Sequence, residues 1–239
     1  MVLDDPPPQE IICPDAGNCP VTNHLPELRF QTVSAGRKWF RVYDAKWGYD
    51  EHNRGFGNTR FAPIDDPVAG VRLPSMYLGA TQAAVLLETV FRGVGEQEPR
   101  VIYQRHLRGQ LMAHVEVPAP VALADLRNPE LRRMGIERRQ IVSSDEEHYP
   151  CTRRLAIAAL GQSGGQTAAG LIWHSRQAEL NGLPPEEVVV LYGTPRFNSE
   201  RGLWGWFGPG ALSLYDGPGR LIVDEVAERI GAVVEDEGD

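Results

Sequence analysis

Five polar residues stand out because they lie at the ends of predicted strands, beside Gly-rich turns or on a predicted helix. They are Arg41, Arg60, Tyr77, Glu88 and Ser175. At such positions a rigid sheet can present side chains to a ligand. Arginine recognises phosphate through two parallel hydrogen bonds, and a carboxylate can stabilise a cationic transition state at a sugar carbon during glycosyl transfer. Together these residue types favour a phosphate-bearing substrate.

Glu88 is notable because it shares a face with apolar residues of a predicted helix. The segment from Met76 to Phe91 predicts a short strand, an N-cap at Thr81 and then a helix. Its apolar residues recur at helical spacing as far as Val94. A carboxylate near that face is costly unless something pairs with it. Glu88 is therefore an edge residue that reaches water, a member of a structural ion pair, or a carboxylate held in a cleft for chemistry.

The other four residues also have purely structural interpretations. Arg41 could be an edge-strand arginine that faces water, and Arg60 could pair with the Asp65-Asp66 dipeptide. Tyr77 could be a core tyrosine whose hydroxyl bonds the backbone, and Ser175 could cap a helix or turn the chain. The residue types alone do not place the five side chains in one site.

The composition is that of an ordinary soluble globular protein, with 42% hydrophobic and 23% charged residues. A length of 239 residues suffices for one large domain, or for a core domain with extensions. The formal net charge of −8 argues against nucleic acid as a direct partner, because phosphate backbones are bound by basic surfaces. A local basic pocket for a small anion is compatible with this charge.

The sequence indicates neither a membrane span, nor a signal peptide, nor a metal site. It has no run of about eighteen apolar residues, and its start lacks the basic and apolar segments of a signal peptide. None of the six histidines has metal-ligand spacing to another. Three cysteines, Cys13, Cys19 and Cys151, give no disulfide framework. We therefore expect a cytoplasmic protein with reduced thiols and no bound metal.

The predicted elements do not alternate regularly between strand and helix, which favours an α+β fold over a doubly wound sheet. Helices are expected after Thr81, after a second N-cap at Thr152, and at 221–230 with Asp224 and Glu225 in its first turn. Strands are expected at 38–43, 75–78, 101–105, 111–117, 121–126, 170–177 and 187–192.

Two segments lack a predicted element. Residues 1–35 are rich in Pro, Asp and Asn, which predicts a poorly ordered or surface-draped arm. Residues 197–212 contain Trp204, Trp206 and four glycines, which predicts a long loop. The remainder, 36–239, is expected to form one domain with its core at 36–195.

Several short motifs follow one another in a particular order between residues 36 and 195. They are Trp39-Phe-Arg-Val-Tyr43, Gly57-Asn-Thr-Arg-Phe-Ala-Pro63, Tyr77-Leu78, Glu88-Thr-Val-Phe91, Ala124-Asp-Leu126, Thr152, Gly170-Leu-Ile-Trp-His-Ser-Arg-Gln177 and Val188-Val-Val-Leu-Tyr192. In this order and spacing they resemble the RES domain family, which is named for its Arg, Glu and Ser. The match is weaker through the last predicted helix.

The resemblance implies a compact mixed or antiparallel sheet with flanking helices, similar to ADP-ribosyltransferases. It implies a toxin of a two-gene toxin–antitoxin system, with an Xre-type helix-turn-helix antitoxin as partner and possible homo-oligomers in their complex. The implied activity is cleavage of the nicotinamide–ribose bond of NAD⁺ by inorganic phosphate or water, with NAD⁺ as substrate and no separate cofactor. Two alternatives are ADP-ribosyl transfer to a protein and a catalytically inactive RES-like binding module.

The resemblance also implies a role for each of the five residues. Glu88, Arg60 and Ser175 would be catalytic: Glu88 would stabilise the ribose cation, Arg60 would hold a phosphate of NAD⁺, and Ser175 would bond the ribose or the nicotinamide amide. Arg41 and Tyr77 would bind substrate. Arg41 would assist with a phosphate, and Tyr77 would stack on or position the nicotinamide.

The sequence departs from the family pattern at two places. The family often has Gly-Gly before the arginine and Asn two residues after it, where this chain has Asn58-Thr59 and Ala62. The conformation of the Arg60 loop therefore does not follow from the resemblance. The N-terminal arm and the loop around Trp204 and Trp206 have no counterpart in the family pattern, and one of them could be where an antitoxin docks.

Overall fold

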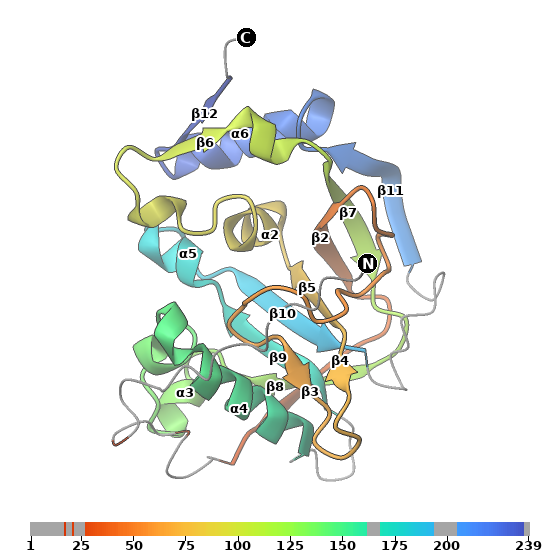
Figure 1. Ribbon diagram of the computed structural model, residues 1–239, viewed down its shortest axis with the longest axis vertical. Helices are drawn as coiled ribbons and strands as arrows, with labels where there is room; N and C mark the ends of the chain where they lie inside the picture. Colours follow the sequence, from red (N-terminus) through yellow and green to blue (C-terminus); the bar gives the residue numbers. More distant parts are fainter. Residues whose placement is uncertain (1–16, 18–20, 22–26, 162–167, 194–204, 237–239) are drawn as a thin grey trace, which may run out of the picture.

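The computed structural model describes residues 17, 21, 27–161, 168–193 and 205–236. Within these residues an eight-stranded mixed sheet forms the centre of the molecule, with strand order β1-β8-β9-β10-β5-β2-β7-β11 (Figure 1). All neighbouring pairs are antiparallel except β8 and β9, which are parallel. The strands are β1 Phe30–Val33, β2 Lys38–Asp44, β5 Ser75–Gly79, β7 Gln110–Glu116, β8 Val121–Asp125, β9 Ala168–His174, β10 Glu187–Tyr192 and β11 Gly205–Ser213.

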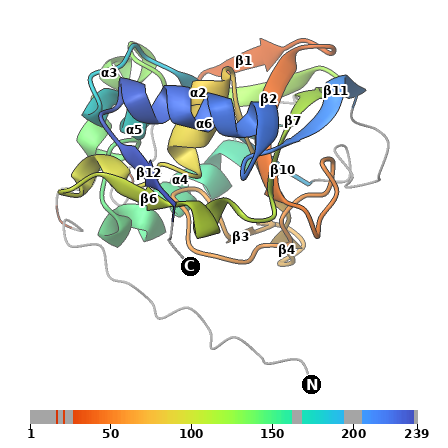
Figure 2. The ribbon, with the colours of Figure 1, turned by 90° about the horizontal axis from the view of Figure 1, so that it is seen from above.

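Helices flank this sheet along its length. Figure 1 shows α4 beside β8 and β9 at one end of the molecule, α6 beside β6 and β12 at the other, and α2 between them. Figure 2 shows α2 and α6 next to each other, in agreement with their direct contact. The helices are α2 Gln82–Glu88, α3 Glu130–Arg133, α4 Tyr149–Gly161, α5 Arg176–Leu180 and α6 Gly217–Arg229.

Short elements complete the described fold. Two small sheets pair β3 (Ile64–Asp65) with β4 (Arg72–Leu73) and β6 (Val101–Tyr103) with β12 (Val233–Glu235). Four 3₁₀ turns lie at Val94–Glu96, Gln104–Leu107, Arg138–Gln140 and Glu146–His148. Across the part of the chain that the structure describes, no helix combines the length and apolar character that a membrane span requires.

The alternation of side chains along β5 determines which residue faces the candidate site. Met76 and Leu78 pack in one buried cluster with Trp39, whereas Tyr77 packs on the opposite side against a cluster that contains Trp173. Apolar residues of α4, among them Leu155, belong to the cluster that Tyr77 contacts. Successive strand residues point to opposite faces, so Tyr77 lies on the face that α4 covers.

The β5–α2 unit forms as the sequence predicts, but its helix is shorter. Thr81 has extended backbone angles and its Oγ1 accepts a hydrogen bond from the Ala84 amide at 2.9 Å. The helix ends at Glu88 and the chain turns through Gly93, which has a positive φ of 80°. Val94 is nevertheless only 4% exposed and packs in the same cluster as α2. The apolar spacing therefore predicts burial correctly and helix length incorrectly.

Two predicted helix starts are wrong. Helix α4 begins at Tyr149, and Thr152 lies inside it, where its hydroxyl donates to the Tyr149 carbonyl at 3.0 Å. A proline in the first turn suits a helix start because its missing N–H needs no partner there. Pro150 supplies this in α4 and Pro218 in α6. Helix α6 accordingly begins at Gly217, so Asp224 does not lie in its first turn.

Besides the short β3 and β4, three strands lie where the sequence predicts none. Phe30–Val33 pairs with β8 as an edge strand, so the last part of the expected arm at 1–35 belongs to the sheet. Gly205–Ser213 pairs with β7, although 197–212 reads as a loop. Gly and Pro argue against a strand in the interior of a sheet but are tolerated at an edge, and β11 is an edge strand. The third is β12, Val233–Glu235. Trp204 and most of residues 1–26 lie outside the described residues.

Candidate functional site

A cavity of about 680 Å³ lies where α2 ends. Its lining combines the end of α2 with the loop before β3, the centre of β5, the end of β9 and the starts of α4 and α5. Its charged and aromatic lining residues are Arg60, Arg92, Arg176, Glu88, Glu96, Asp145, Glu146, Tyr77, Tyr149 and Trp173. The cavity therefore offers three guanidinium groups and four carboxylates, of which Glu88 lies at the end of α2.

Glu88 is held by Ser175. The Ser175 hydroxyl donates to Glu88 Oε1 at 2.5 Å, and its oxygen accepts from the Ala178 amide at 3.2 Å as the N-cap of α5. Ser175 is 1% exposed, so its rotation is restricted by packing. Because a hydroxyl carries one proton, that proton points to Glu88. Ser175 therefore caps a helix, as one interpretation of the sequence predicts, and the same hydroxyl also contacts Glu88.

Helices α2 and α5 begin at a common anchor. Thr81, which caps α2, donates from Oγ1 to Glu186 Oε2 at 2.8 Å. Ser175, which caps α5, donates from its backbone amide to the Glu186 carbonyl at 2.8 Å. Glu186 directly precedes β10, the strand between β5 and β9. The residues at the two helix starts are therefore fixed to the central sheet.

Arg60 lies in the same cavity and braces a distant loop. Its Nη1 donates to the carbonyls of Ile141 and Ser144, each at 2.8 Å, and to Ser144 Oγ at 2.7 Å. Its guanidinium lies 5.4 Å from the centre of the Tyr149 ring. Burial lowers the pKa of Arg60, and the charges of Tyr149 and then Glu88 oppose that shift. The pairing with an aspartate does not occur, because Asp65 instead pairs with an arginine of β4.

Helix α4 holds the residues directly before Arg60. Arg153 donates to the Thr59 carbonyl at 3.0 Å and to the Asn58 side chain. Thr59 closes a turn, donating from its amide and its hydroxyl to the Ala62 carbonyl at 2.9 and 2.8 Å. The Thr152 hydroxyl also donates to the Arg60 carbonyl. The loop at Asn58 and Thr59 is thus held by side chains of α4.

Two further arginines of the cavity were not among the sequence candidates. Arg92 donates to the Tyr149 hydroxyl at 2.7 Å and lies 3.5 Å from Glu146. Arg176 contacts both Glu96 and Asp145 at 2.9 Å. Each has a positional signal in the sequence, since Arg92 follows Glu88 by four residues and Arg176 directly follows Ser175. Neither signal is specific, because an arginine four residues after a glutamate or next to a serine occurs in many sequences without a binding role.

Tyr77 forms part of the wall of this cavity. Its hydroxyl lies 2.8 Å from Thr59 Oγ1 and accepts from the Phe61 amide at 3.3 Å. Burial raises the pKa of Tyr77 to about 12, so the hydroxyl is neutral at physiological pH. Its backbone-bonded hydroxyl matches the structural interpretation, while its place in the wall leaves it available to a ligand.

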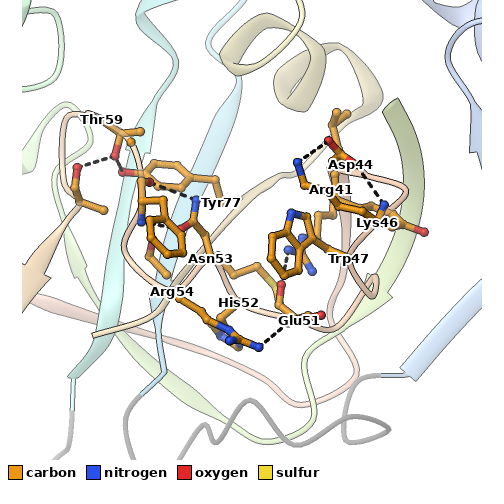
Figure 3. A pocket seen from close by; sticks show the side chains of 17 residues that line it. Arg41, Asp44, Lys46, Trp47, Glu51, His52, Asn53, Arg54, Thr59 and Tyr77 are labelled. Atoms are coloured by element: carbon orange, nitrogen blue, oxygen red, sulfur yellow. Dashed lines mark hydrogen bonds and ion pairs between the residues drawn. The ribbon is translucent and has the colours of Figure 1, made fainter. Parts of the chain in front are cut away.

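Arg41 is not brought to Glu88. It lines a second cavity of about 550 Å³, which shares Thr59 and Tyr77 with the first (Figure 3). Arg41 is 7% exposed, and its guanidinium donates to the carbonyls of Gly48, Tyr49 and Glu51. Burial lowers its pKa to about 10. Arg41 therefore holds the loop after β2 and does not face water as an edge arginine.

The fold is similar to that of a chain in the crystal structure of the M. tuberculosis MbcT–MbcA toxin–antitoxin complex. The likeness covers 82% of this chain and 92% of that chain, with a TM-score of 0.54 and 15% sequence identity. The two chains share a fold. The expectation of an α+β fold with a mixed sheet and flanking helices is confirmed. No family model and no curated protein matches the sequence.

The arrangement can bind an anion and stabilise a nearby positive charge. Glu88 supplies an oriented carboxylate, and Arg60, Arg92 and Arg176 supply cations around it. Among the described residues, no group of three or more His, Cys, Asp or Glu side chains could hold a metal ion. The residues that are present suit a substrate that carries phosphate and develops a cation at carbon.

Proposed function

We propose that this protein cleaves the nicotinamide–ribose bond of NAD⁺ and acts as the toxin of a toxin–antitoxin pair. The observation that carries the proposal is the Glu88 carboxylate, bonded by Ser175 at 2.5 Å in a cavity that three arginines line. The order of motifs that resembles the RES family supports the activity. The likeness to a chain of a toxin–antitoxin complex supports the biological role.

In this mechanism Glu88 stabilises the positive charge that builds on the ribose ring. The bond between ribose C1′ and the nicotinamide nitrogen breaks, and its electron pair leaves with nicotinamide as a neutral molecule. The carboxylate, fixed before the reaction by Ser175, lies close to the developing cation and needs no reorganisation. An oxygen of inorganic phosphate then bonds C1′, or a water oxygen does so and releases its proton.

The arginines bind the pyrophosphate by exchanging partners. Arg176 now pairs with Glu96 and Asp145, whose side chains are 49% and 76% exposed, and Arg92 pairs with Glu146, which is 69% exposed. Exposed ion pairs contribute roughly 0–1 kcal/mol. A pyrophosphate can therefore displace these carboxylates into water at little cost and take the guanidinium groups, while Arg60 keeps its loop contacts.

Incubation of the purified protein with NAD⁺, with and without phosphate, followed by mass analysis of the products, tests the activity. ADP-ribose 1″-phosphate indicates phosphorolysis, ADP-ribose indicates hydrolysis, and a protein that gains ADP-ribose indicates transfer. Glu88→Gln should lower turnover roughly 10²- to 10³-fold with the fold intact. Turnover by this variant at the wild-type rate would refute the role of Glu88.

The biological role has a separate test. Expression of the chain in a bacterial host should arrest growth, and Glu88→Gln should relieve the arrest. Co-expression of a small neighbouring gene of the Xre helix-turn-helix type should also relieve it. Normal growth during expression of the active enzyme would contradict the toxin role and leave the enzymatic proposal standing.

A further inference from the structure

The second cavity adjoins the Glu88 cavity through two shared residues. Thr59 and Tyr77 line both cavities, and their hydroxyl oxygens lie 2.8 Å apart. Figure 3 shows Thr59 and Tyr77 at one side of the second cavity and Trp47 at the other. Arg60, which lines the Glu88 cavity, directly follows Thr59 in the chain. The bonded pair Thr59–Tyr77 is therefore a common wall, and a ligand longer than either cavity would extend across it to occupy both.

Two aromatic side chains line the second cavity without being packed in the core. Trp47 is 40% exposed and Phe56 is 64% exposed. The Trp47 ring also lies beside two cations, with Lys46 Nζ 5.7 Å and the Arg54 guanidinium 6.0 Å from its centre. An exposed ring that lines a hollow can stack on a planar ligand, and the neighbouring cations can bind an anionic group of that ligand.

Buried groups hold the loop that presents these aromatic rings. Arg41 donates to three carbonyls of the loop, those of Gly48, Tyr49 and Glu51. Further along, Asn53 Oδ1 accepts from the amides of residues 55 and 56 at 2.9 and 2.8 Å. The rings are therefore presented by a loop with fixed internal bonds, which reduces the ordering that ligand binding would require.

The charges of the lining fit a ligand with few negative charges. Three cationic residues, Arg41, Lys46 and Arg54, face two carboxylates, Asp44 and Glu51. Lys46 pairs with Asp44 at 3.0 Å and Arg54 with Glu51 at 3.4 Å. Arg54 and Lys46 are 68% and 64% exposed, so a phosphate can compete for them. The small excess of positive charge suits a nucleotide and not a long polyanion.

We propose that the second cavity binds the adenosine monophosphate half of NAD⁺, with the purine stacked on Trp47 and a phosphate oxygen near Lys46 or Arg54. The proposal rests on the proposed function, because it assigns the other half of that substrate to the Glu88 cavity. The dinucleotide then crosses the junction at Thr59 and Tyr77. Arg41 acts in this site as the residue that shapes the loop.

Isothermal titration of the full chain with AMP, and separately with ADP-ribose, tests this assignment without turnover. Base–aromatic stacking is worth roughly 1–3 kcal/mol per base, so Trp47→Ala should raise the Kd of both ligands about tenfold. Trp47→Phe keeps a ring and should restore most of the affinity. Val68→Ala is the control, because Val68 is 95% exposed and lies outside both cavities.

Three results would overturn the assignment. They are no heat from AMP at millimolar concentration, an unchanged Kd for AMP in Trp47→Ala, and weaker AMP binding with unchanged ADP-ribose binding. The last result would place the nucleotide and the substrate at separate sites. A chain that binds both ligands through Trp47 but leaves NAD⁺ intact would refute the proposed catalysis and keep the assignment of the cavity.

Discussion

Replacing Ser175 with alanine separates the two tasks of its hydroxyl. The oxygen caps α5 by accepting from the Ala178 amide, and the proton orients Glu88 from 2.5 Å. Thr81 has the same arrangement at α2, where its oxygen accepts from the Ala84 amide and its proton goes to Glu186. Glu88 lines the cavity and Glu186 does not. Thr81→Ala is therefore a matched control that removes a cap without touching the site.

Loss of the helix cap and loss of the bond to Glu88 differ in size, and the first affects stability whereas the second affects kcat. Loss of an N-cap costs about 1 kcal/mol of stability, and both variants should lose this amount. A hydrogen bond to a charged group is worth roughly 1.5–3 kcal/mol. In Ser175→Ala that bond no longer orients Glu88, which is half-buried and can turn toward water. If most of this energy serves catalysis, kcat should fall roughly 10- to 100-fold, at 1.36 kcal/mol per factor of ten.

The assay combines urea unfolding with steady-state turnover of NAD⁺. We expect both variants to unfold at slightly lower urea concentration and only Ser175→Ala to lose kcat. Equal activity of Ser175→Ala and the wild type, in protein shown to be folded, would mean that the 2.5 Å bond does not position the catalytic carboxylate. A similar loss of kcat in Thr81→Ala would mean that helix stability and not the bond to Glu88 controls the rate.

Three further predictions concern the cations, a buried histidine and the sheet. Arg92→Ala should raise the KM for NAD⁺ roughly tenfold, because it removes a charged hydrogen-bond donor, while Arg139→Ala, at an 81% exposed side chain, should not change KM. Burial lowers the pKa of His52 from 6.5 to about 4. Between these pH values the unfolded chain therefore binds a proton that the folded chain excludes. Acidification from pH 6.5 to 4 should lower the free energy of unfolding by up to roughly 3 kcal/mol. Urea unfolding at each pH should show a smaller loss in His52→Gln. Gly170→Ala would place its Cβ 1.8 Å from a carbonyl of β10 and should lower the free energy of unfolding by roughly 1–3 kcal/mol or more, whereas Gly161→Ala, with nothing within 4 Å, should not.

Local patterns predict the parts of the fold that depend on neighbours in sequence. The cap at Thr81, the strand at β5 and the run of β-branched residues in β10 follow from residues within a few positions. Edge strands β1 and β11 do not follow from local patterns, because β1 has only four residues and β11 contains several Gly and a Pro, and each is completed by pairing with a distant strand. Helix α5 was missed because its five residues are too few for a period.

In the candidate site, too, the sequence indicates residue types but not which distant residues come into contact. The approach of Ser175 to Glu88 joins residues 87 positions apart, and that of Arg60 to Ser144 joins residues 84 positions apart. Their residue types suggest chemistry, but only the order of several motifs indicates that they meet. Arg41 shows the converse: its place among aromatic residues in a strand suggests a binding role, while its three backbone acceptors use the guanidinium to shape a loop.

The position of Tyr77 connects these observations to the size of the substrate. A side chain of the central strand β5 that packs against Trp173 on one face also lines both cavities. Its neutral hydroxyl is bonded to Thr59 and to the Phe61 amide, on either side of Arg60. The loop that carries Arg60 is thereby anchored to the sheet between the two cavities. A dinucleotide that occupied both cavities, as proposed above, would pass this anchored loop.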